Sequence, residues 1–150
     1  MPQIYLKFAP RVRDLATESL IKTLDVALTL AVMEVWKVPQ HDITVSAEHL
    51  IYARSEADVQ IEIRYTAGEY EYDWGEPFDP TREEQESIAV RMQGVAQEIM
   101  GESYAERELA KGEKTLVIPP QFSVSVWTKP SYKGFFLPPE PSNRGFLPTK

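Results

Sequence analysis

Pro2 is the residue of this sequence with the most distinctive chemistry, because it stands directly before an alternating polar and apolar segment, residues 3–8. A small second residue usually permits removal of Met1, and Pro2 would then carry a free secondary amine at the end of a strand. An unperturbed α-amine has a pKa of about 8, and an apolar surrounding lowers that pKa towards neutrality. The position therefore predicts an amine that acts as a general base, a general acid or a nucleophile.

The composition narrows the class of protein. The chain has 150 residues, 43% of them hydrophobic, which is enough for one domain with a hydrophobic core. Its net charge of −7 disfavours nucleic acid or an anionic membrane as a partner. It has no cysteine, and its two histidines, His41 and His49, fall in no metal-binding motif. The chain also lacks a long apolar run and a leader-like start, so we expect a soluble, cytoplasmic protein that binds neither membrane nor nucleic acid.

Strands and helices alternate along the chain. Apolar residues recur at every second position in four segments, which predicts strands over 3–8, 42–53, 59–64 and 122–127. A helical stripe follows the first strand over 15–37, with Asp14 as the expected N-cap. A second helix is expected to open at Asp79, or at Thr81 with Glu84 as a capping box, and to stop at Gly101.

This order of elements predicts an α/β (α+β) fold in which two consecutive β-α-β units form a four-stranded mixed sheet with two helices on one face. The units span about 2–53 and 58–128, so one domain covers 1–128. A proline- and aromatic-rich extension follows over 129–150 and is unsuited to helix or central strand. The other face of such a sheet is bare, and the expected cover is another copy of the chain.

Besides Pro2 before the first strand, two short segments stand out at the end of the first predicted helix and at the start of the second: Val38-Pro39-Gln40-His41-Asp42 and Pro80-Thr81-Arg82-Glu83-Glu84-Gln85. In these features the chain resembles the tautomerase superfamily, whose β-α-β fold carries an amino-terminal proline. The nearest branches are 5-carboxymethyl-2-hydroxymuconate isomerase, macrophage migration inhibitory factor and malonate semialdehyde decarboxylase. The resemblance covers about residues 2–128. The tyrosine-rich insertion 67–79, which could cap the site or cover a sheet edge, the connection 102–119 and the tail lie outside it.

The resemblance implies roles for individual residues. Pro2 matches the catalytic acid/base amine, and Asp42 matches a functional aspartate of the decarboxylase type, with a turn-stabilising role as the alternative. An arginine that holds a substrate carboxylate would be Arg11 or Arg13, which flank the matching position, or Arg64, whose alternative is an ion pair with Glu62 or Glu48. The aromatic residues Tyr5 and Trp127 could wall the pocket around Pro2 or belong to the core.

Together these features predict an enol–keto isomerase that acts on a 2-oxo acid or a related carbonyl compound and needs no metal and no organic cofactor. The resemblance implies a homotrimer. Two alternatives keep the same scaffold: a hydratase, dehalogenase or decarboxylase in which Asp42 activates water beside Pro2, and a catalytically silent trimer whose pocket is filled by its own tail. A ferredoxin-like binding module outside the superfamily is a further alternative.

Overall fold

One five-stranded sheet organises the protein, as the computed structural model shows for residues 2–54, 56–66, 78–110, 120–129 and 134–137. Its strands are β1 (Gln3–Phe8), β2 (Thr44–His49), β3 (Val59–Thr66), β4 (Phe122–Lys129) and β5 (Gly134–Leu137), in the order β2-β1-β3-β4-β5. β1 and β2 run parallel, as do β3 and β4, whereas β1 and β3 are antiparallel. The predicted fold class, two β-α-β units in a mixed sheet, is confirmed.

The number of strands differs from the prediction. β5 comes from the segment predicted as an extension, and it pairs antiparallel with β4 at the edge of the sheet. Gly134–Leu137 contains no proline, so its backbone can join the edge although prolines surround it. The predicted capping segment lies, apart from Phe78 and Asp79, outside the described residues.

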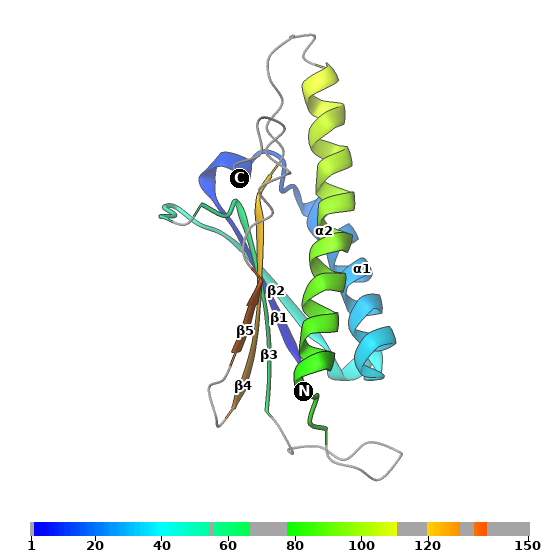
Figure 1. Ribbon diagram of the computed structural model, residues 1–150. Coiled ribbons are helices and arrows are strands. Elements are labelled where there is room, and N and C mark those ends of the chain that lie inside the picture. Colours follow the sequence, from blue (N-terminus) through cyan, green and yellow to red (C-terminus); the bar gives the residue numbers. More distant parts are fainter. Residues whose placement is uncertain (1, 55, 67–77, 111–119, 130–133, 138–150) are drawn as a thin grey trace.

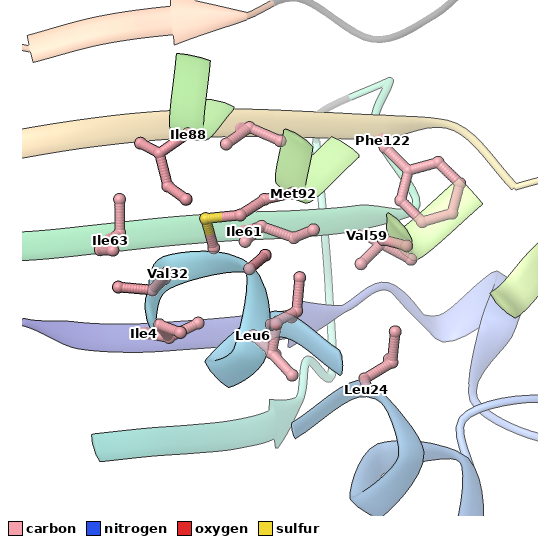
Figure 2. Packing of buried hydrophobic residues seen from close by; sticks show 14 of the residues in the cluster. Ile4, Leu6, Leu24, Val32, Val59, Ile61, Ile63, Ile88, Met92 and Phe122 are labelled. Carbon is pink, nitrogen blue, oxygen red and sulfur yellow. The ribbon is translucent and has the colours of Figure 1, made fainter. Parts of the chain in front are cut away.

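Two helices, α1 (Glu18–Trp36) and α2 (Arg82–Ala110), cover one face of the sheet and pack against each other (Figure 1). Between helices and sheet lies the hydrophobic core (Figure 2). Alternate residues of β1 and β3 point into this core, among them Ile4, Leu6, Ile61 and Ile63, each at most 1% exposed. Burying such side chains is the main stabilising contribution to the fold.

The helix boundaries correct two predictions. Thr17, not Asp14, is the N-cap of α1, because its hydroxyl accepts a hydrogen bond from the backbone N–H of Leu20 at 3.2 Å while residues 10–12 form a 3₁₀ helix. Gly101 does not end α2, which continues to Ala110. The capping box is confirmed: the N–H of Glu84 donates to the Thr81 hydroxyl at 3.2 Å, and the Glu84 carboxylate accepts from the N–H of Thr81 at 2.8 Å.

The sheet face opposite the helices is called the open face here, since no described helix or strand covers it. It carries the residues that alternate with the core positions, and most of them are polar: Gln3, Tyr5, Lys7, Gln60, Glu62, Arg64, Ser123, Ser125 and Trp127. In the described residues, this face is therefore polar rather than apolar. An assembly across it would therefore be held by polar and ionic contacts.

Candidate functional site

Pro2 is buried at the end of β1. Its carbonyl accepts a hydrogen bond from the N–H of Thr44 at 3.2 Å, which ties it to the start of β2. On the other side, the antiparallel register pairs Gln3 with Arg64, so the next position along places Tyr65 opposite Pro2. Cross-strand neighbours have Cβ atoms about 5 Å apart, so Tyr65 is the neighbour of Pro2 on the helix-covered face.

Three aromatic rings form a wall on that covered face. Trp36 from the end of α1, Tyr65 from β3 and Phe78 before α2 contact one another edge to face, with centroids 5.2–5.4 Å apart. The Tyr65 hydroxyl accepts a hydrogen bond from Gln85 at 2.6 Å, and burial raises the pKa of Tyr65 although this hydrogen bond opposes the rise. The wall therefore joins α1, α2 and β3 on the covered face, at the end of the sheet where Pro2 lies.

The open face brings three predicted site residues together near the same strand end. Gln3, Arg64 and Trp127 lie in one row across β1, β3 and β4. The Arg64 guanidinium lies over the ring of Tyr5, 5.1 Å from its centroid, and the Trp127 indole donates to the hydroxyl of Ser125 at 3.0 Å. Tyr5, Arg64 and Trp127 thus lie on the open face near the end of β1 where Pro2 is placed.

Arg64 also makes the ion pair that was its alternative role. Its Nε and Nη2 donate to one carboxylate oxygen of Glu62 at 3.2 and 2.7 Å, and Lys7 Nζ lies 3.1 Å from the other oxygen. Burial would raise the pKa of Glu62, but the hydrogen bonds from Arg64 and Lys7 outweigh it and hold that pKa below its ordinary value. Glu62 is therefore charged between two cations.

Arg11 and Arg13 lie at the opposite end of β1, about 20 Å away by the rise of a six-residue strand. Arg11 binds Asp58 through Nε and Nη2, both at 2.9 Å, and this hydrogen bond with Asp58 raises the pKa of the guanidinium. Arg13 reaches the carbonyl of Leu50 at 3.5 Å. Within one chain, neither arginine is brought to Pro2.

Asp42 lies at the Pro2 end of the sheet, in the connection before β2. It closes a short 3₁₀ helix, Gln40–Asp42, two residues before Thr44, and its backbone N–H donates to the carbonyl of Pro39 at 3.0 Å. One carboxylate oxygen lies 3.7 Å from Nε2 of the exposed His41. The backbone hydrogen bond belongs to the 3₁₀ turn, and the role of the Asp42 carboxylate stays a prediction.

Among the described residues, no group of three histidine or acidic side chains could hold a metal ion. None of the described helices has the length and apolar character needed to cross a membrane.

Comparison with known proteins reveals similarity of fold. No family model matches the chain, and no curated protein matches its sequence. The structure is similar to a fused 4-OT described as a symmetric trimer (13% identity, 66% of this chain and 74% of that chain, TM-score 0.48). It is similar to malonate semialdehyde decarboxylase (14%, 66% and 74%, 0.42) and to a macrophage migration inhibitory factor-like protein of Entamoeba histolytica (13%, 67% and 76%, 0.46). Each of these similarities concerns the fold alone.

Sequence reasoning missed the aromatic wall and the role of Glu62. Trp36 and Tyr65 were visible as apolar positions of a helix and a strand, but their contact joins positions 29 residues apart through the fold. Glu62 was visible only as one possible partner of Arg64. The signal available in the sequence was the i, i+2 spacing of an acid and an arginine on one strand, which places both on one face.

Proposed function

We propose that this protein is a cofactor-independent enol–keto tautomerase of a 2-oxo acid or a related carbonyl compound, with Pro2 as the general acid and base. The observation that carries the proposal is the position of Pro2: it is buried at the end of β1 at which the aromatic wall lies on the covered face and Tyr5, Arg64 and Trp127 lie on the open face. Removal of Met1 is part of the proposal, since only a terminal Pro2 has a basic nitrogen.

In the proposed reaction, the neutral Pro2 amine removes the proton of the enol hydroxyl and becomes an ammonium. One of the two N–H protons of this ammonium is then delivered to the substrate carbon, which restores the neutral amine. The substrate is isomerised, so no atom or electron is gained or lost. Apolar surroundings such as the rings of Tyr65 and Trp36 favour the neutral amine. Arg64 is the proposed carboxylate ligand, because it is the predicted site arginine that lies at the Pro2 end.

A homotrimer is the proposed assembly. The fused 4-OT with a similar fold is described as a trimer, and three 17.1 kDa chains would have a mass of about 51 kDa. Because the open face is polar, contacts across it would be weakened by salt. Light scattering after size-exclusion chromatography, at low and high ionic strength, measures the mass and its salt dependence.

The experiment that tests the function is ketonisation of phenylenolpyruvate by the wild type and by Pro2→Ala. We expect saturable turnover that falls at least about 100-fold in the variant, which is the usual contribution of a positioned general acid or base. Pro10→Ala is the matched control, because Pro10 is an exposed internal proline at the far end of β1. Intact-mass spectrometry of the purified protein checks that Met1 has been removed.

Turnover that is unchanged by Pro2→Ala would contradict the proposal, as would a mature protein that retains Met1. Absence of saturable turnover in the wild type would favour the water-activating or the silent alternative. In that case Asp42→Asn is the next variant to examine for the first alternative.

A further inference from the structure

Arg64 is turned back along its own strand, away from the strand end. Its guanidinium lies between the carboxylate of Glu62, two residues earlier in β3, and the ring of Tyr5, the cross-strand partner of Glu62. Two residues of strand correspond to about 7 Å. The Cα of Arg64 therefore lies near the Pro2 end, whereas its guanidinium is held about 7 Å further from that end, beside Glu62 on the open face.

The two partners of this ion pair differ in freedom. The side chain of Arg64 is 52% exposed, whereas that of Glu62 is 14% exposed and is also bound by Lys7. A long, exposed arginine can change rotamer at low cost, while a carboxylate held from two sides stays in place. Any movement in this pair is therefore a movement of Arg64.

We propose that Glu62 restrains Arg64 and is the positioning residue that sets the affinity of the Pro2 site for a carboxylate ligand. This inference rests on the proposed function and adds the reason why Arg64 is bound to an internal acid. A carboxylate arriving at the strand end must compete with Glu62 for the Nε and Nη2 donors, because both belong to the bidentate face that carboxylates prefer.

The charges of the cluster give the direction of the effect. Lys7, Arg64 and Glu62 together carry one net positive charge. Replacement of Glu62 by glutamine would leave two cations flanking Tyr5 and only a neutral amide as competitor for the guanidinium. Affinity for an anion should rise for both reasons. Since an exposed ion pair is weak, the expected gain is about threefold to fivefold.

The test measures binding of 3-phenylpropionate, a carboxylate that cannot enolise, by tryptophan fluorescence, for which Trp127 in the same row is a natural reporter. Glu62→Gln is expected to bind about threefold more tightly than the wild type, and Arg64→Gln at least tenfold more weakly. Glu48→Gln is the matched control: it removes the same charge from an exposed position of the same face, opposite Lys7 in the register. The neutral amide 3-phenylpropanamide should bind all four proteins equally.

Kinetics with phenylenolpyruvate add a second readout. Glu62→Gln should lower KM by the same factor and leave kcat unchanged, because the restraint acts on binding. Weaker binding by Glu62→Gln, or a gain no larger than that of Glu48→Gln, would overturn the inference. So would an Arg64→Gln variant that binds like the wild type.

Failure of the proposed function gives a different result. If Glu62→Gln tightens binding but Pro2→Ala turns over normally, the restraint stands and Pro2 is not the catalytic amine. If Pro2→Ala loses turnover but keeps its affinity for 3-phenylpropionate, while Glu62→Gln has no effect, then Pro2 is the catalytic amine and Glu62 does not restrain Arg64.

Discussion

The ion pair of Arg11 with Asp58 offers a test of whether this arginine serves the fold or a substrate. Arg11 was predicted from the resemblance as a carboxylate ligand, and its guanidinium is bound instead by two hydrogen bonds of 2.9 Å to an internal carboxylate. Asp58 also accepts the backbone N–H of Gln121 at 2.8 Å, and Tyr104 lies 5.9 Å from the guanidinium. The pair joins the loop after β1 to the starts of β3 and β4.

The expected losses differ for the two partners. Arg11 is 41% exposed, so its replacement by alanine should cost only about 1 kcal/mol of unfolding free energy, as for a well-formed surface pair. Replacing Asp58 removes the same pair and also the carboxylate that serves a buried N–H, which adds about 1–3 kcal/mol. We therefore expect about 2–4 kcal/mol for Asp58→Ala, a fall in melting temperature of roughly 10 °C for a chain of this size.

Urea unfolding followed by circular dichroism measures these losses, and the double variant Arg11→Ala/Asp58→Ala closes the cycle. The coupling between the two changes should be about 1 kcal/mol. Arg54→Ala is the control for loss of an exposed arginine. In parallel, the KM of Arg11→Ala for phenylenolpyruvate should equal that of the wild type.

Arg11 would not serve the fold if Arg11→Ala left the unfolding free energy unchanged and raised KM about tenfold. That result would mean that Arg11 leaves Asp58 to bind substrate at the Pro2 end of another copy in the assembly. A stability loss together with an unchanged KM would assign Arg11 to the fold.

Two further predictions concern stability. Lys37, the C-cap of α1, has φ 57° and ψ 38°, which is the left-handed region. The strain of a non-glycine residue there is about 1–2 kcal/mol, which exceeds the entropic cost of glycine, about 0.5–1 kcal/mol. Lys37→Gly should therefore raise the free energy of unfolding in urea by about 0.5–1 kcal/mol, and an equal gain in Lys37→Ala would contradict this explanation. The pKa of Glu62 is lowered in the folded state, so the unfolded chain binds more protons and the free energy of unfolding rises with pH. The contribution of ionised Glu62 to stability is fully present above about pH 4.3, the pKa in the unfolded chain. It is lost as the pH falls through the lower pKa of the folded state. The stability difference between wild type and Glu62→Gln should accordingly shrink from pH 6 to pH 3, and a constant difference would show that the ion pair does not contribute.

Local patterns predicted the elements well because each depends on neighbouring residues. Ile61 and Ile63 alternate with polar residues, and both lie in the core. The capping box of Thr81 and Glu84 needs only three residues' spacing, and it is present. Asp14 failed as a cap because the chain continues in a turn after the 3₁₀ helix of residues 10–12, so that the helix begins only after Thr17, whose hydroxyl is also a suitable cap. Gly101 failed as a stop because an isolated glycine costs a helix only about 1 kcal/mol, which the packing of α2 offsets.

The candidate site could be predicted only in part, because its geometry depends on which strands meet. Pro2 was predicted from its position in the chain and stays a prediction, whereas the place of Tyr65 opposite it follows from continuing the antiparallel register of β1 and β3 by one residue, which no local pattern indicates. The same register brings Tyr5 and Arg64 together. In contrast, the partner of Arg11 lies 47 residues away, and nothing near Arg11 in the sequence identifies it.

The arginine–carboxylate ion pairs at the two ends of β1 thus differ in their surroundings. At the far end, the acid that binds Arg11 is 11% exposed and also accepts a backbone N–H, so the arginine completes a structural junction. At the Pro2 end, Arg64 is half exposed and its acid is shared with Lys7, so the arginine can leave without stranding a buried charge. An ion pair that one partner can leave at low cost suits a binding site, and one whose loss disturbs two strands suits the fold. The place of Arg64 at the Pro2 end, together with the second cation that Glu62 keeps when Arg64 leaves, is why the proposed carboxylate ligand is Arg64.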